Sequence, residues 1–131
     1  MNKKMDFSKY NGYFHDGYLR KISHKGSDID FFLESCIINP QEILKKNLLS
    51  KDNKIKGVLK IISIKSLILD DRELHKSLEM EYDYAEILTL KTNQKEAYLL
   101  IEWDNYAPKP QADKISEIKI EAEEIYWESI P

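Results

Sequence analysis

The chain has 131 residues, of which 42% are hydrophobic and 33% charged, and its formal net charge is −3 at pH 7. This length predicts a single domain, residues 1–131, built around one core. The aromatic content of 11% is far above that of disordered chains. The acidic balance, with Arg20 the one arginine among residues 1–65, argues against a nucleic-acid partner.

Signals for export, membrane insertion and metal binding are missing from the sequence. The first residues lack the apolar run of a signal peptide, and no apolar stretch approaches the roughly twenty residues of a membrane span. Cys36 is the single cysteine, which rules out an internal disulfide and a multi-cysteine metal site. We therefore expect a cytoplasmic protein with no membrane partner, no metal and no cofactor.

Charge is distributed unevenly along the chain. Residues 1–65 hold 13 Lys and Arg against 7 Asp and Glu, a net charge of +6, whereas residues 66–131 hold 7 against 16, a net charge of −9. One interpretation is that facing strands pair these charges across a sheet. The other is that the acidic half forms a face that binds a basic partner through complementary fields.

Two segments have the alternation and the turn residues of β-hairpins. In the first, strands around Ile22 and Phe31 flank residues 25–28, whose sequence Lys-Gly-Ser-Asp is typical of a turn. In the second, residues 86–91 and 96–103 flank a polar turn. Both segments predict antiparallel neighbours.

The segments between the hairpins combine helix and strand signals. Residues 39–42 are typical of the capped start of a short helix. Residues 55–69 are rich in Ile, Val and Leu, which predicts a largely buried strand, or two strands with a kink near Lys65. Gly57 marks a bulge or a close backbone approach. At residues 70–73, a second capped helix start competes with an irregular connection.

The C-terminal region predicts a loop followed by a long strand. Residues 104–113 carry two prolines and no periodicity, which is typical of a loop. In the strand, Ile118 begins an alternation that Trp127 resumes one residue out of phase, and a bulge at Glu123 and Glu124 would keep both apolar sets inward. The whole pattern predicts a mainly β fold, α+β at most: an antiparallel meander of six or seven strands forming a sandwich or half-open barrel, with one or two short helices.

His15 and Asp16 are neighbours ahead of the first predicted strand and form one candidate site. A small-molecule-binding or hydrolytic role would use His15 as a base oriented by a carboxylate. The alternative is that the pair caps the strand and hydrogen-bonds the backbone. Cys36 lies in an apolar strand, where a buried cysteine is common, and no nucleophile-elbow or phosphate-binding glycine motif occurs. The sequence therefore assigns no catalytic residue.

A second candidate site, which we call the acidic aromatic face, consists of five residues near the end of the chain. They are Trp103, Asp104, Tyr106, Glu124 and Trp127. Tryptophan and tyrosine are frequent interface anchors, and a loop stiffened by prolines loses little entropy on binding. The alternative is that Trp103 ends a core strand and the loop only crosses the edge of the sheet.

The sequence Phe-His-Asp-Gly-Tyr-Leu at residues 14–19, followed by a glycine-containing turn, resembles the opening of a bacterial family of small β-rich proteins described as a domain of unknown function. Residues 55–57, 100–103 and 121–125 fit the same pattern. Some groups of this kind resemble immunity proteins, which neutralise a toxin by binding it. The resemblance implies a binding role and assigns no functional residue.

Three hypotheses for function follow. The first is a protein-binding module, immunity-like, that holds its partner on the acidic aromatic face. The second is a small-molecule-binding or hydrolytic protein with its site around His15 and Asp16. The third is a structural domain that forms a homo-oligomer by pairing an exposed strand edge, such as residues 115–120, with its own copy.

Overall fold

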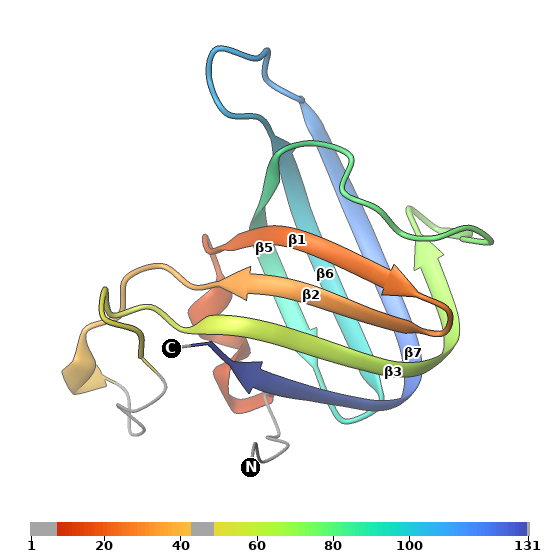
Figure 1. The fold of residues 1–131 in the computed structure, drawn as a ribbon, viewed down its shortest axis with the longest axis horizontal. Coiled ribbons are helices and arrows are strands. Elements are labelled where there is room, and N and C mark those ends of the chain that lie inside the picture. Colours follow the sequence, from red (N-terminus) through yellow and green to blue (C-terminus); the bar gives the residue numbers. More distant parts are fainter. Residues whose placement is uncertain (1–7, 43–48, 131) are drawn as a thin grey trace.

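Seven antiparallel strands form one sheet that closes on itself in the computed structural model, which describes residues 8–42 and 49–130 (Figure 1). Two 3₁₀ helices accompany the strands. The elements in chain order are η1 (Ser8–Phe14), β1 (Tyr18–Lys25), β2 (Asp28–Glu34), η2 (Pro40–Glu42), β3 (Lys56–Leu69), β4 (Arg72–Glu73), β5 (Tyr84–Thr92), β6 (Glu96–Asp104) and β7 (Lys114–Ser129).

The strand order explains how the sheet closes. It runs β2-β1-β5-β6-β7-β3-β4, and β2 also pairs with β3, so that six strands complete a barrel and β4 extends one edge. The predicted mainly β, antiparallel architecture is confirmed, and the barrel is closed rather than half-open. In the described part of the chain, no helix is long and apolar enough to span a membrane.

Both predicted hairpins are confirmed. β1 and β2 pair from Tyr18 to the turn, where Lys25 lies opposite Asp28 and Gly26 has the positive φ of 60° that such a tight turn favours. β5 and β6 pair up to Thr92 opposite Ala97. Local turn chemistry therefore determines where the chain reverses in both hairpins.

β3 and β7 are the longest strands, and both bend so that they follow the curve of the barrel (Figure 1). Along β7, Ala122 and Ile125 are both buried, so the inward-facing set changes phase at Glu123 and Glu124, as predicted. The register shift of the β3–β7 ladder lies on β3, beside Lys65, where a kink was predicted, and not at Glu123 and Glu124, where the bulge was predicted.

The expected open edge at residues 115–120 is wrong. β7 lies between β6 and β3, so that Ile118 pairs with Leu99 on one side and with Leu69 on the other. Residues 118–120 are thus paired on both sides, and the backbone of Glu117 is hydrogen-bonded to Asp70, so residues 117–120 offer no edge for a second copy.

The two short-helix predictions have different outcomes. The backbone amide of Gln41 donates to the side chain of Asn39, which caps η2 as expected, while residues 43–48 lie outside the described part of the chain. The helix start at residues 70–73 is wrong. Asp70 and Asp71 instead form a two-residue turn between β3 and β4, with φ values of 52° and 67°, a geometry that aspartate tolerates.

The core fills the barrel with large side chains from every long strand. Phe14 and Trp127 are fully or almost fully buried, and their rings pack edge to face at 5.6 Å. The Nε1–H of Trp103 donates to Ser116 at 2.9 Å, and that of Trp127 donates to Ser129 at 2.9 Å. Each buried indole therefore has a partner for its one polar group.

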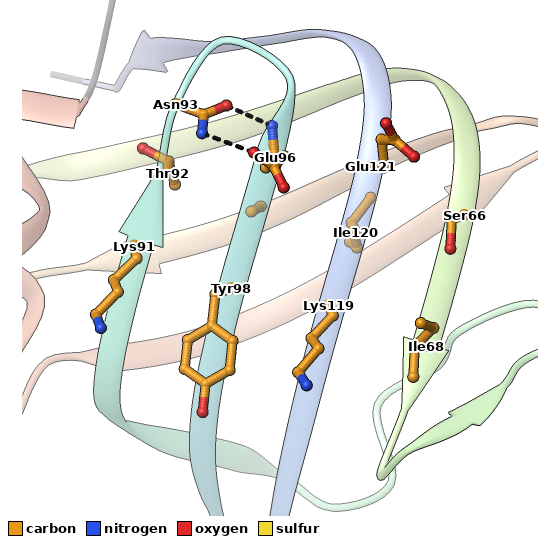
Figure 2. Close-up of a pocket in the computed structure, with 11 residues that line it drawn as sticks. Ser66, Ile68, Lys91, Thr92, Asn93, Glu96, Tyr98, Lys119, Ile120 and Glu121 are labelled. Carbon is orange, nitrogen blue, oxygen red and sulfur yellow. Dashed lines mark hydrogen bonds between the residues drawn. The ribbon is translucent and has the colours of Figure 1, made fainter.

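The outer surface of the barrel is hollowed across β5, β6, β7 and β3 (Figure 2). This hollow has a volume of about 400 Å³, which lies within the usual range of small-molecule sites. We call it the four-strand hollow.

Candidate functional site

The structure does not assemble the predicted acidic aromatic face. Trp103 and Trp127 are each only 1% exposed and belong to the core, so neither can anchor a partner. Glu124 lies beside the β5–β6 turn, because the amide that follows it donates to the carbonyl of Gln94. Tyr106 follows the opposite end of β6, about 30 Å away along a nine-residue strand. The predicted surface position of the two tryptophans is therefore wrong, and of the remaining three residues only Asp104 and Tyr106 lie at the same end of the sheet.

At that end, Tyr106 belongs to a group that we call the tyrosine–arginine cluster. Its members are Tyr18, Arg20, Tyr84 and Tyr106. The rings of Tyr84 and Tyr106 stack at 5.0 Å, and Tyr18 meets Tyr84 edge to face at 5.7 Å. The guanidinium of Arg20 lies 4.5 Å from the centre of the Tyr18 ring. β1, β5 and the loop after β6 thus contribute to one patch.

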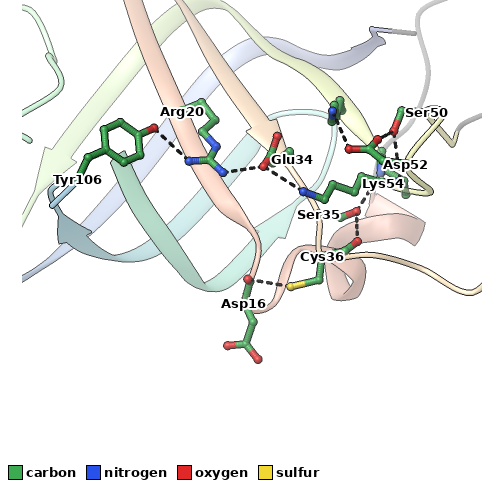
Figure 3. A network of polar contacts seen from close by, with 11 residues as sticks. Asp16, Arg20, Glu34, Ser35, Cys36, Ser50, Asp52, Lys54 and Tyr106 are labelled. Atoms are coloured by element: carbon green, nitrogen blue, oxygen red, sulfur yellow. Dashed lines mark hydrogen bonds and ion pairs between the residues drawn. The ribbon is translucent and has the colours of Figure 1, made fainter. Parts of the chain in front are cut away.

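Arg20 connects this cluster to β2 (Figure 3). It donates to Glu34 at 2.7 Å and to the hydroxyl of Tyr106 at 3.2 Å. Burial lowers the pKa of Arg20, but its hydrogen bond and charge attraction to Glu34 outweigh that effect, so the pKa is raised. Lys54 lies 3.6 Å from the same carboxylate oxygen. The guanidinium is therefore held in one position, as an interface anchor requires.

The carboxylate of Asp83 holds the loop that carries Tyr106. The backbone amide of Tyr106 donates to Asp83 at 2.9 Å, and the ammonium of Lys109 lies 2.8 Å from the same carboxylate. These two contacts, that of Lys109 first, lower the pKa of Asp83. The predicted site residue Asp104 accepts a hydrogen bond from the hydroxyl of Tyr84 at 3.3 Å. The cluster and its loop therefore hold each other in place.

Three acidic side chains, which we call the carboxylate row, border the cluster. They are Asp16, Glu86 and Glu102. Glu86 lies directly opposite Glu102 in the β5–β6 ladder and opposite Tyr18 in the β1–β5 ladder. Partial burial, then the charges of Asp16 and Glu102, raise the pKa of Glu86. The row therefore concentrates negative charge beside the aromatic rings.

His15 and Asp16 lie at the end of this row. Both are largely exposed, and His15 uses Nδ1 to donate to the carbonyl of Leu88 at 2.7 Å, while its Nε2 lies 3.7 Å from the Asp16 carboxylate. Asp16 has a φ of 64°, and a side chain at the next residue, Gly17, would lie 2.4 Å from the carbonyl of Glu34. This geometry matches the capping interpretation of the pair.

The thiol of Cys36 faces the same corner. Its Sγ donates to the backbone carbonyl of Asp16 at 2.9 Å. Cys36 follows the end of β2 and is exposed, so the expected buried position in a strand is wrong. Partial desolvation of the thiol first, then the negative charges of Asp16 and Glu86, raise its pKa, whereas a nucleophilic cysteine requires a lowered one. Within residues 8–42 and 49–130, no three His, Cys, Asp or Glu side chains are arranged to hold a metal ion.

Sequence reasoning missed five residues of this site. They are Tyr18, Arg20, Glu34, Tyr84 and Glu86. The outward position of two of them could have been predicted from the alternation of the strands. Tyr18 directly precedes the buried Leu19, and Tyr84 directly precedes the buried Ala85. Their meeting depends on the pairing of β1 with β5, which no local pattern predicts.

No family model, no curated protein and no solved structure matches the chain. The family resemblance expected from the sequence therefore gains no support from these comparisons, and function has to be argued from the site itself.

Proposed function

We propose that this protein is a binding module that holds a basic surface of a protein partner on the tyrosine–arginine cluster and the carboxylate row. The observation that carries the proposal is the mutual packing of three tyrosines and one arginine on the outside of the barrel, beside Glu86 and Glu102. Tyrosine and arginine are the residue types that most often dominate binding energy at protein interfaces.

The physical reasons are preorganisation and charge. Because the cluster is already fixed by its own contacts, a partner would have to immobilise few side chains, which lowers the entropic cost of association. Tyr106 is 54% exposed, so its ring is available to a partner. The neighbouring carboxylates would attract a basic surface and accelerate the encounter at low salt.

An immunity-like role is the specific form of this function that the family resemblance implies. In that form, the partner would be a toxin with a basic surface, and binding would block the toxin. The alternative hydrolytic function at His15 and Asp16 has no specific observation in its favour, since the conditions beside them disfavour a Cys36 thiolate and the pair lies apart from the four-strand hollow.

Site-specific photo-crosslinking tests the proposal. A photoreactive phenylalanine is placed at position 106 in one variant and at position 25 in the other, because Tyr106 is 54% exposed and Lys25, also exposed, lies at the opposite end of β1 from Tyr18. In lysate of the source organism, we expect position 106 to capture a basic protein that mass spectrometry identifies, and position 25 to capture none.

The captured partner then permits a quantitative measurement. Tyr106→Ala should weaken its binding at least about tenfold, the effect of a hot-spot residue, whereas Lys25→Ala, at the far end of β1, should leave the affinity unchanged. Equal effects of the two substitutions, or a binding rate that does not fall as salt is raised, would contradict the proposal.

A further inference from the structure

The four-strand hollow lies on a different part of the barrel surface from the tyrosine–arginine cluster, and two rows of side chains cross it (Figure 2). Each of the four strands, or the turn at its end, contributes one residue to each row. The first row is Lys91, Tyr98, Lys119 and Ile68, and the second is Asn93, Glu96, Glu121 and Ser66.

Strand geometry determines the distance between the rows. Neighbouring members of a row are cross-strand partners, as Tyr98 is of Lys119 and Glu96 is of Glu121. Along one strand the two rows are two residues apart, from Lys119 to Glu121 for example, which corresponds to about 6.7 Å. Residues at this spacing point to the same face of the sheet.

The two rows carry opposite charges. The first has two lysines, Lys91 and Lys119, on either side of the Tyr98 ring, and the second has two glutamates. Glu96 and Glu121 are directly opposite each other, an arrangement that costs stability unless a cation lies nearby. The side-chain amide of Asn93 donates to Glu96 at 3.2 Å and keeps that carboxylate at the end of the hollow.

Tyr98 lies within the first row, between the two lysines. Its hydroxyl donates to Glu117 at 2.8 Å, which leaves the ring face as apolar surface at the lysine end of the hollow. The ammonium of Lys119 lies 3.5 Å from Glu117 and 3.9 Å from Asp71, and because an ammonium has three N–H donors, it can also donate to a ligand. The hollow thus has two lysines with an aromatic ring between them at one end and two glutamates at the other.

We propose that the four-strand hollow binds a short aliphatic zwitterion, with its carboxylate at Lys91 and Lys119, its ammonium at Glu96 and Glu121, and its alkyl chain along the ring of Tyr98. The ammonium relieves the repulsion between the two glutamates. A ligand of this class must separate its charges by several methylenes, because the two rows lie two residues apart along each strand, about 6.7 Å.

A titration of the isotope-labelled full chain with 6-aminohexanoate, followed by NMR, tests the proposal. We expect saturable shifts of the backbone amides of Tyr98, Lys119 and Glu121. Hexylamine and hexanoate each carry one of the two charges and should bind at least about tenfold more weakly. Glycine, whose charges are too close to reach both rows, should also bind at least about tenfold more weakly.

Two variants separate the ends of the site. Lys91→Gln should weaken the binding of 6-aminohexanoate and leave that of hexylamine unchanged, whereas Glu121→Gln should weaken both. Lys25→Gln, which changes an exposed lysine on β1, should alter neither affinity. The proposal is overturned if 6-aminohexanoate causes no saturable shift, if hexylamine or hexanoate binds as tightly, or if Lys25→Gln has the same effect as Lys91→Gln.

Discussion

Gly57 lies where the start of β3 passes the end of β7. A Cβ at this position would lie 2.2 Å from the carbonyl of Glu128 and 2.7 Å from the ring of Trp127, which is itself buried. Since neither the backbone nor the packed indole can move freely, Gly57→Ala should destabilise the protein by about 2–3 kcal/mol. Denaturant unfolding monitored by tryptophan fluorescence measures this change.

Gly12→Ala is the matched control for that measurement. A Cβ at Gly12 meets no atom within 4 Å, so the free energy of unfolding should change by less than about 0.5 kcal/mol. If the two alanine variants were equally stable, the close approach at Gly57 would not constrain the fold.

Glu86 makes the free energy of unfolding depend on pH, and the direction of this dependence follows from the shift of its pKa. Its pKa is raised in the folded protein, by partial burial first and then by Asp16 and Glu102, so the folded state holds a proton more tightly than the unfolded chain. The stability that this group contributes is therefore complete at acidic pH and is lost as pH rises through its folded pKa. Glu86→Gln should raise stability by about 0.2–1 kcal/mol at pH 7 and change it little at acidic pH.

Chemical denaturation of this variant at both pH values measures the effect, with Glu79→Gln, in the exposed β4–β5 connection, as the control. An equal gain at both pH values would show that Glu86 is not repelled by its neighbours.

At the scale of elements, one histidine anchors the β4–β5 connection. The amide of Leu78, which is only 3% exposed, donates to Nδ1 of His24 at 2.8 Å, so Nε2 carries the proton and donates to the carbonyl of Gly26 at 3.1 Å. His24→Ala should leave that amide without an acceptor, reduce stability by about 1–2 kcal/mol and accelerate hydrogen exchange at Leu78. His75→Ala, in the exposed part of the connection, should change neither quantity.

Elements with local causes could be predicted from the sequence, and those with non-local causes could not. The turn at Gly26 and the phase change at Glu123 depend on neighbouring residues, and both predictions are confirmed. The alternation of Leu99, Ile101 and Trp103 already indicated that the tryptophan is buried. The prediction of an acidic aromatic face gave more weight to residue type than to this phase, and for that reason its placement of Trp103 on the surface was wrong.

At the scale of the whole molecule, closure of the barrel could not be predicted from the sequence, because it requires β3 to pair with both β7 and β2, which are distant from each other along the chain. The same long-range pairing determines which charges meet. Lys65 on β3 and Glu123 on β7 form an ion pair between the basic and acidic halves, but Lys60 pairs with Asp30 and Lys114 with Glu81 within one half. The acidic half therefore keeps carboxylates available on the surface beside Tyr106, which no count of charges along the chain reveals.

The barrel has one short seam, and its strength can be measured. β1 and β5 pair only at Tyr18 with Glu86 and at Leu19 with Ala85. Two adjacent backbone bonds join Ile87 to the residues before β1, from its amide to the carbonyl of Gly17 and from the amide of Asp16 to its carbonyl. In contrast, β7 pairs with β3 from Ile118 to Ser129. Because it has few hydrogen bonds and includes Glu86, which its neighbours repel, this seam should be the easiest part of the barrel to open. The opening that exposes the amide of Ile87 should therefore cost less free energy than the opening that exposes the amide of Ile118. Native-state hydrogen exchange at increasing denaturant should show a weak denaturant dependence for Ile87 and the full dependence of global unfolding for Ile118. If both amides followed the global transition, the barrel would open as one unit, and the tyrosine–arginine cluster across the seam would be as rigid as the core.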